Sequence, residues 1–188
     1  MSVRRLIEDS MPLAEISEHS AREKSIVYGH ISALHRWWAR RPLAAARAVT
    51  MAALLPAPRD EDERRTFHNL ISDNLDWDLG RDPKKQAADL RAIMRQHAAI
   101  QNPKILDPFA GGGALPLEAM RLGAEAHATD LNPVAHLVEL ATLSYPQMFA
   151  RELNQPTEWN GELRLVSEIR KWAEVIHKRV SDDIRVYY

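Results

Sequence analysis

The sequence predicts an α/β fold, in which the first half of a doubly wound parallel sheet is flanked by helical extensions at both ends. Two observations predict it. Residues 104–143 read in order as strand, glycine-rich turn, helix, strand and helix, which is the repeating unit of such sheets. The rest of the chain carries apolar residues at helical spacing. We therefore divide the 188 residues into four regions: 1–56, 57–103, 104–143 and 144–188.

The first region is expected to form two helices. Proline suits the first turn of a helix, where its missing N–H leaves no bond unmade. One helix is therefore expected from Pro12 to Lys24 and another from Pro42 to Leu55. The second is rich in alanine, which favours a helix, and Pro56 then ends it.

The second region reads as a charged helical insertion. Residues 60–75 and 84–100 carry apolar side chains at helical spacing, and a turn is expected at 78–83. We find no chemistry in this region and expect a solvated helical hairpin. The C-terminal extension is expected to be mostly helical, with an amphipathic stretch over residues 163–180.

The third region contains the two expected strands. Lys104–Asp107 is expected to be a short buried strand, and Ala124–Thr129 a second strand. The helix between them covers Ala114–Leu122, and Gly123 suits its C-terminal cap. Pro133 opens a second helix, which is expected over Val134–Leu143.

Composition excludes several classes of protein. The chain contains no cysteine, which excludes disulfides, zinc–cysteine sites and thiol catalysis within it and fits a reducing cytoplasm. No apolar stretch approaches the roughly 20 residues that span a bilayer, so we expect a cytoplasmic protein without membrane contact. The net charge is −1, but positive charge gathers at Arg36, Arg40, Arg41 and Arg47. His30 and His35 have no acidic residues at matching spacing, and no metal site is expected.

The glycine turn after the first strand is the motif that carries chemistry. Glycine lets backbone N–H groups approach a ligand closely. The dinucleotide fingerprint Gly-x-Gly-x-x-Gly fits poorly, because its third glycine would fall at Pro116. Asp107 precedes Gly111–Gly113 and would repel a pyrophosphate. The same carboxylate attracts an amino or sulfonium group, so the turn favours a zwitterionic ligand.

A second carboxylate, Asp130, ends the second strand 23 residues after Asp107. A carboxylate in this place can accept hydrogen bonds from both ribose hydroxyls of a nucleoside, whether in S-adenosylmethionine or NAD. Leu131 would then pack on the adenine. Asn132 has a competing interpretation as the cap of the helix at Pro133.

These residues resemble a known family. Asp107–Gly113 is similar to the first motif of class I S-adenosylmethionine-dependent methyltransferases, in the Asp-Pro-Phe-x-Gly-x-Gly form of amino-methylating DNA and RNA enzymes. Thr129–Pro133 is similar to their second motif. A resemblance to N-terminal domains of unknown function is carried by Leu13–Ser17, Arg22–Ser25, Gly29–His30 and Leu34–Ala44, the last with its string Trp-Trp-Ala-Arg-Arg-Pro. Such domains head large adenine-specific DNA methylases, some of them encoded among anti-phage defence genes.

The resemblance implies a Rossmann-like class I methyltransferase sheet, S-adenosylmethionine as cofactor and nucleic acid, above all DNA, as partner. The residues it implies for cofactor binding are Asp107, Pro108, Phe109, Ala110, Gly111, Gly112, Gly113, Asp130, Leu131 and Asn132. The residues expected to contact substrate or cofactor are His35, Trp37, Trp38, Arg40, Arg41 and Pro42.

Two features of this second group are left open by the sequence. One tryptophan of the Trp37–Trp38 pair is expected to pack under the sheet, and the other to stack on a flipped base or to wall the cofactor's methionine end. Arg40 and Arg41 either bind nucleic-acid phosphates or pair with acidic residues nearby. The acidic candidates are Glu15, Glu18 and Glu23.

The chain departs from the family in one respect. Amino-methylating enzymes carry a further motif, Asp/Asn/Ser-Pro-Pro-Tyr/Phe, and this chain has no Pro-Pro pair. We therefore expect no catalytic residue in it, and expect a second polypeptide or a further C-terminal region to complete the sheet. DNA adenine-N6 methylation is the leading interpretation. RNA amino-methylation and a non-catalytic cofactor- or nucleic-acid-binding subunit of a defence complex are alternatives. An open sheet edge also favours a homodimer.

Overall fold

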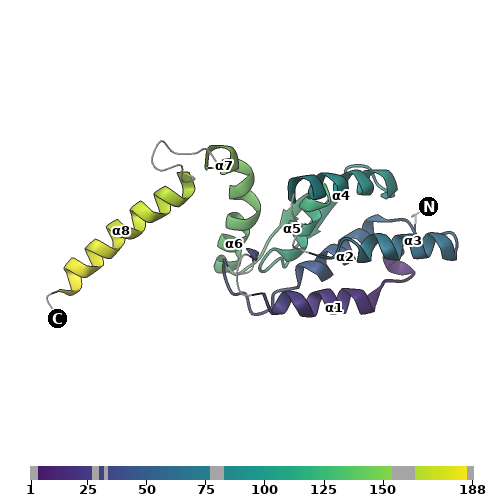
Figure 1. The fold of residues 1–188 in the computed structure, drawn as a ribbon, viewed down its shortest axis with the longest axis horizontal. Helices are drawn as coiled ribbons and strands as arrows, with labels where there is room; N and C mark the ends of the chain where they lie inside the picture. The colour runs from purple at the N-terminus through teal and green to yellow at the C-terminus, as the bar shows by residue number, and fades with distance from the viewer. Residues whose placement is uncertain (1–3, 27–29, 32–33, 77–82, 154–163, 186–188) are drawn as a thin grey trace. The chain divides into compact units, whose positions relative to one another are not determined.

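The computed structural model describes residues 4–26, 30–31, 34–76, 83–153 and 164–185 (Figure 1). The chain divides into two compact units, Met1–Leu143 and Ser144–Tyr188. The described part is a mixed α/β structure that is mostly helical and holds one small parallel sheet. The predicted α/β class is therefore confirmed.

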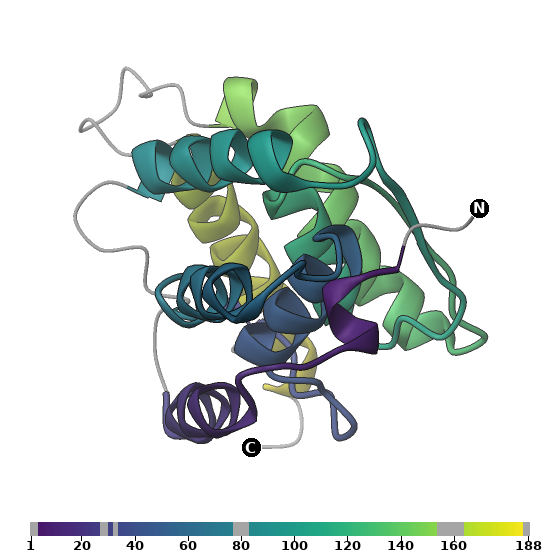
Figure 2. The same ribbon diagram turned by 90° about the vertical axis from the view of Figure 1, so that its right-hand side faces the viewer.

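Helices form the N-terminal part of the first unit, where they were expected. Both views place α3 between α1 and α4 (Figures 1 and 2). The bounds are a short 3-10 turn η1 (Leu6–Glu8), α1 (Leu13–Lys24), α2 (Leu43–Leu54), α3 (Glu61–Ser72) and α4 (Pro83–His97). The turn expected at 78–83 lies, apart from Pro83, outside the described residues.

The expectation of a solvated hairpin is wrong for the apolar faces of α3 and α4. Phe67 and Ile71 of α3 are buried, as are Leu90 and Met94 of α4. All four belong to the larger hydrophobic cluster, which is centred on α2. The helical spacing of these residues collects them on one face of each helix, and burying that face removes apolar surface from water. Only the charged faces of these helices are solvated.

The predicted strands and the helix between them are present within a residue or two, whereas the helix after the second strand is α-helical only to Glu139 and π-helical beyond it. The elements are β1 (Lys104–Asp107), α5 (Ala114–Arg121), β2 (Glu125–Ala128), α6 (Pro133–Glu139) and a π-helical segment η3 (Leu140–Ser144). The strands pair in parallel, with Lys104 opposite Glu125 and Asp107 opposite Ala128. Both strands therefore end at the same edge of the sheet.

The first strand is not buried, contrary to expectation. Leu106 is 64% exposed, and its neighbours on the same face, Lys104, Glu125 and His127, are also exposed. The opposite face packs on α5. Because successive residues of a strand point to opposite faces, one covering helix buries only every second residue.

The second unit is helical, as predicted, and contains α7 (Tyr145–Leu153) and α8 (Arg164–Ile184). In α8 the expected amphipathic pattern leaves a stripe of exposed apolar side chains, which are Val166, Ile169, Trp172, Ile176, Val180 and Ile184. None of the helices in the described part of the chain is both long and apolar enough to cross a membrane.

Candidate ligand-binding site

Two loops meet at the edge where β1 and β2 end. One is the glycine turn (residues 108–113), which leads into α5, and the other is the Asp130 loop (residues 129–132), which leads into α6. Thr129 joins them: its N–H donates to the Asp107 carbonyl at 3.0 Å, and its carbonyl accepts from the Ala110 N–H at 3.0 Å. The ends of adjacent parallel strands thus bring the two loops together at one edge of the sheet.

The glycine turn needs glycine at two of its three glycine positions. Gly111 has φ +54° and Gly113 has φ +74°, in the left-handed region that other residues rarely adopt. Gly113 also starts α5, since its carbonyl accepts from the Leu117 N–H at 3.0 Å. The missing Cβ atoms let the backbone of the turn lie directly against the Trp37 side chain at Gly111 and Gly112.

Asp130 holds the two loops together. Its Oδ2 accepts a hydrogen bond from the Gly111 N–H at 2.8 Å, and its Oδ1 accepts from the Asn132 N–H at 2.8 Å. The N–H groups of Asn132 and, secondly, Gly111 lower the pKa of the Asp130 carboxyl, so the group is ionised at neutral pH. A carboxylate has about four lone-pair sites, more than these two hydrogen bonds use.

Asp107 and Asn132 each cap a turn as well as facing the site. The Asp107 carboxylate accepts from the Phe109 N–H at 3.1 Å. The Asn132 Oδ1 accepts from the Val134 N–H at 2.9 Å, which confirms the capping interpretation of Asn132. Capping uses one oxygen of the Asp107 carboxylate, and the other is not needed for the turn.

Two large apolar side chains of the predicted cofactor set stand in solvent. Phe109 is 79% exposed and Leu131 is 95% exposed. Pro108 is exposed as well, whereas Ala110 is buried. Exposed apolar side chains carry no packing role, so Phe109 and Leu131 are free to cover a ligand bound between the loops.

The side chains of Trp37 and Trp38 have different surroundings. Trp37 covers the glycine turn: a methyl group added at Gly111 would come within 2.7 Å of its Nε1, and one at Gly112 within 3.4 Å of its Cβ. Trp38 is fully exposed. The expectation that one tryptophan packs under the sheet is therefore wrong, because the segment before α2 crosses the turn instead.

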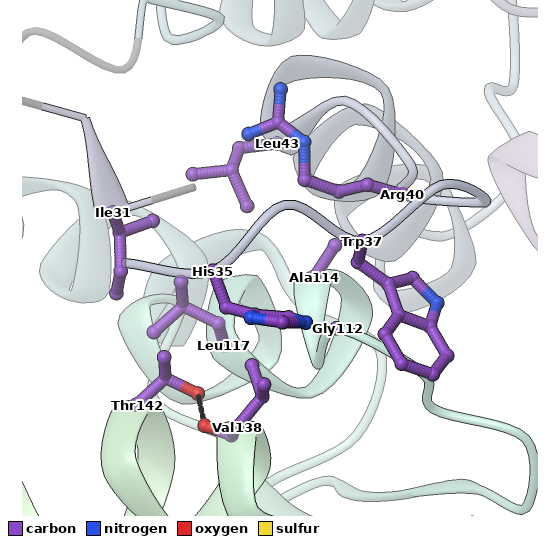
Figure 3. A pocket seen from close by; sticks show the side chains of 10 residues that line it. All are labelled: Ile31, His35, Trp37, Arg40, Leu43, Gly112, Ala114, Leu117, Val138 and Thr142. Carbon is purple, nitrogen blue, oxygen red and sulfur yellow. Dashed lines mark hydrogen bonds between the residues drawn. The ribbon is translucent and has the colours of Figure 1, made fainter. Parts of the chain in front are cut away.

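An open hollow lies beside the glycine turn (Figure 3). In Figure 3 the His35 imidazole occupies its centre, with Trp37 to one side and Val138 and Thr142 below. The lining residues are Ile31, His35, Trp37, Arg40, Leu43, Gly112, Ala114, Leu117, Val138 and Thr142. The structure thus brings three members of the predicted second group to the turn, whereas Trp38, Arg41 and Pro42 lie outside the lining.

Packing of α2 against α5 brings these distant segments together. Leu43 and Ala46 of α2 form a second hydrophobic cluster with Ala114, Leu117 and Leu143. This contact fixes the start of α2 next to the start of α5. The chain before α2, which carries His35, Trp37 and Arg40, is therefore held beside the glycine turn.

A buried ion pair reinforces the same contact. Arg47 of α2 donates from Nε to Glu118 of α5 at 2.6 Å, and both side chains are almost completely buried. Arg47 also donates to the carbonyls of Asn74 and Asp76, at 2.7 and 2.8 Å, and Arg121 donates to Glu118 at 2.5 Å. The pair is thus fully hydrogen-bonded, as buried charges require.

Arg40 contacts two buried side chains, His30 and Glu23. Its guanidinium donates to His30 Nδ1 at 3.2 Å, which leaves the proton of a neutral imidazole on Nε2, 3.4 Å from Glu23 Oε1. Burial, and secondly the guanidinium groups of Arg40 and Arg121, lower the pKa of His30 to about 4. Arg40 also lies 3.6 Å from Glu23, so the acidic partner of Arg40 is Glu23.

Sequence reasoning missed Glu139, which ends α6 next to the turn. Its side chain is buried, and a methyl group at Gly113 would lie 3.7 Å from its Cγ. Burial, and secondly the charges of Asp130 and Asp107, raise the pKa of Glu139. A lone acidic residue in the otherwise apolar run 137–141 was the available signal. Among the described residues, no group of three His, Cys, Asp or Glu could hold a metal ion.

Comparison with known proteins places only the N-terminal part of the chain. No curated protein and no solved structure gives a significant match. One family model matches a segment of the chain. This segment covers less than half of the chain, includes His35–Pro42 and ends before the glycine turn. Residues 10–93 are similar to a family described as a protein of unknown function (DUF1156).

Proposed function

We propose that this chain binds S-adenosylmethionine at the glycine turn and is the cofactor-binding portion of a nucleic-acid amino-methyltransferase, with N6 of adenine in DNA as the favoured target. The observation that carries the proposal is the placement of Asp107 and Asp130. Both carboxylates lie at the ends of paired parallel strands, with the turn between them.

The hydrogen bonding of the turn argues against a phosphate ligand. Phosphate cradles need free backbone N–H groups. The N–H groups of Ala110, Gly111 and Gly113 already donate, to Thr129, Asp130 and Ala110 in turn. A pyrophosphate would have to displace these bonds while facing two carboxylates. A ligand with positive charge and hydroxyl groups has neither difficulty, which favours S-adenosylmethionine over a dinucleotide.

The proposal assigns a role to each part of the site. The free lone pairs of Asp130 accept the ribose hydroxyls, and the exposed Leu131 covers the adenine. Asp107 attracts the amino group of the methionine part. Trp37 walls the turn on the side of α2. Bound S-adenosylmethionine supplies an already activated methyl group, so the task left to the protein is to align the reacting groups.

Nucleic-acid contact is proposed for the surface that includes Trp38. Its indole is fully exposed, and Arg36 and Arg41 beside it in sequence are exposed as well. Aromatic side chains stack on unpaired bases, and arginines bind phosphates. An exposed tryptophan between arginines has no packing role to explain it, and this supports a role in binding single-stranded or flipped nucleotides.

The fold proposed for the complete enzyme is the Rossmann-like class I sheet, of which β1, α5 and β2 would be the first unit. The exposed residues of β1 and β2 support further strands or helices covering this sheet. We place the target-base pocket outside residues 1–188, because the family's Pro-Pro motif does not occur in them.

Calorimetric titration tests this function. We expect saturable binding of S-adenosylmethionine and no binding of NAD at the same concentrations. The isosteric variant Asp107→Asn keeps the turn's hydrogen bond to Phe109 but removes the charge, and should weaken binding without unfolding the chain. Saturable binding of NAD in place of S-adenosylmethionine would overturn the proposal.

A further inference from the structure

Glu139 is a buried carboxylate whose charge the protein leaves unmatched. The residue is 4% exposed, and its Oε1 has no hydrogen-bond partner in the described part of the chain. It ends α6, directly after the Asp130 loop and its helix. An ionised carboxylate in this setting costs several kcal/mol unless something compensates it.

The side chain of Glu139 lies at the glycine turn. A methyl group at Gly113 would lie 3.7 Å from its Cγ, so the absence of a side chain at Gly113 leaves the carboxyl stem against the turn's backbone. Besides burial, the charges of Asp130 and Asp107 raise the pKa of the Glu139 carboxyl, and the charge of His136 lowers it. Three carboxylates, from the end of β1, the loop after β2 and the end of α6, therefore lie near one turn.

Glu118 shows how a buried carboxylate of the same unit is satisfied by basic partners. Glu118 is as deeply buried in the same unit, yet both its oxygens accept hydrogen bonds from arginines, Arg47 and Arg121. Natural proteins leave few buried polar groups unsatisfied, and those few gather at functional sites. A positively charged ligand group would supply the partner that Glu139 lacks.

Resting on the S-adenosylmethionine site proposed above, we propose that Glu139 is a further ligand-binding residue that recognises a positively charged group of the ligand held on the glycine turn. S-adenosylmethionine offers two such groups, the sulfonium and the α-ammonium. S-adenosylhomocysteine keeps only the ammonium, and 5′-methylthioadenosine has neither. These three molecules share the adenine and ribose and differ in charge, so they separate recognition of charge from general fit.

The experiment is a titration of the full chain and its Glu139→Gln variant with these three molecules. Loss of one charge-assisted hydrogen bond corresponds to about tenfold in affinity. We expect S-adenosylmethionine to bind about tenfold more weakly to Glu139→Gln and 5′-methylthioadenosine to bind unchanged. An unchanged affinity for S-adenosylhomocysteine assigns Glu139 to the sulfonium, and a parallel loss assigns it to the ammonium; both support the proposal.

Controls separate this role from a structural one. Glu125→Gln removes an exposed carboxylate from β2 and should leave all three affinities unchanged. The Tm of Glu139→Gln should equal or exceed that of the wild type, because the change removes an unmatched buried charge. If Glu139→Gln does not fold, Glu139→Asp is the alternative variant, because it keeps the carboxylate but shortens the side chain by one methylene. It should lower the affinity for S-adenosylmethionine relative to that for 5′-methylthioadenosine.

Two outcomes overturn the proposal. Equal weakening of all three ligands would make Glu139 a structural residue, and unchanged affinities would remove it from the site. Either result leaves the proposed function intact, since the wild type still binds. A wild-type chain that binds none of the three molecules contradicts the proposed function itself, and the role of Glu139 with it.

Discussion

The Asp130 carboxylate accepts a hydrogen bond from the Gly111 N–H at 2.8 Å, across 19 residues of sequence. This bond joins the end of β2 to the turn that follows β1, and therefore does two things. It stabilises the left-handed conformation of the turn, and it occupies the Gly111 N–H, which could otherwise donate to a phosphate. The specificity proposed for the site depends on this bond.

The Asp130–Gly111 bond should be visible in stability as well as in binding. In Asp130→Asn one carboxylate oxygen is replaced by an NH₂ group, which accepts no hydrogen bond. The side chain therefore loses its bond to the N–H of either Gly111 or Asn132. We expect the Tm to fall by a few degrees and S-adenosylmethionine affinity to fall with it. Thermal unfolding followed by circular dichroism, together with titration, checks this. A variant with unchanged Tm would show that the bond does not hold the turn.

Gly111 should tolerate a side chain far less well than its neighbour. Gly111→Ala puts a Cβ on a left-handed residue and within 2.7 Å of Trp37 Nε1, whereas Gly112→Ala meets Trp37 only at 3.4 Å. The backbone strain alone costs about 1–2 kcal/mol. Urea denaturation should therefore rank wild type, Gly112→Ala and Gly111→Ala in falling order of unfolding free energy. The reverse order of the two variants contradicts the placement of Trp37.

The buried pair Arg47–Glu118 should be essential for folding of the first unit. Arg47→Met leaves Glu118 with only Arg121 and removes the donors to the carbonyls of Asn74 and Asp76. Breaking a buried pair on one side costs about 3–5 kcal/mol. Chemical denaturation is the measurement, and the double variant Arg47→Met with Glu118→Leu should recover part of the loss. A loss below about 1 kcal/mol in Arg47→Met would contradict the burial of this pair.

Acid should destabilise the chain through His30. The pKa of His30 is lowered from an ordinary 6.5 to about 4 in the folded chain. At a pH between these two values, His30 is therefore protonated in the unfolded chain but not in the folded one. The contribution of His30 to the free energy of unfolding is complete above pH 6.5 and is lost as the pH falls towards 4. The total loss is about 3 kcal/mol. The pKa of Glu23 is raised, mainly by burial, which works in the opposite direction.

For this reason the test of His30 is a difference between two proteins. His30→Asn cannot take up the proton, so the free energy of unfolding of the wild type minus that of the variant should shrink from pH 6.5 to pH 4. Denaturation at four or five pH values gives the curve. A difference that stays constant over this range would show that His30 titrates normally in the folded chain.

The exposed Trp38 should matter for nucleic acid and not for the fold. Stacking on one base is worth about 1–3 kcal/mol, so Trp38→Ala should weaken binding of a single-stranded oligonucleotide by about tenfold or more. Fluorescence anisotropy with labelled DNA and RNA of the same sequence measures this and also compares the two substrates. Trp172→Ala, an exposed tryptophan on α8, is the matched control and should bind like the wild type. Equal weakening in both variants would remove the special role of Trp38.

Local features of this chain could be predicted from its sequence, because they depend on neighbouring residues. Pro12, Pro42 and Pro133 mark helix starts, and the glycine turn follows from a short apolar strand before a glycine run. The juxtaposition of Asp107 and Asp130 also follows, since parallel strands end at one edge. These predictions required no long-range packing.

Features set by long-range packing could not be predicted. Burial of Phe67 and Met94 depends on α2, and the pairing of Arg47 with Glu118 spans 71 residues. Trp37 rests on the glycine turn only because α2 packs on α5. A charged background around apolar residues is common to solvated and packed helices, so the pattern alone cannot distinguish them.

The most direct test of the central claim is to record which backbone amides respond when S-adenosylmethionine is added to the isotopically labelled chain. Two-dimensional NMR spectra at increasing ligand concentration supply this. We expect saturable shifts at Gly111–Gly113 and at Asp130–Asn132, with smaller shifts near Trp37, and no such response to NAD. Saturable shifts confined to other segments, or none at ligand concentrations in the millimolar range, would contradict the claim that this turn is an S-adenosylmethionine site.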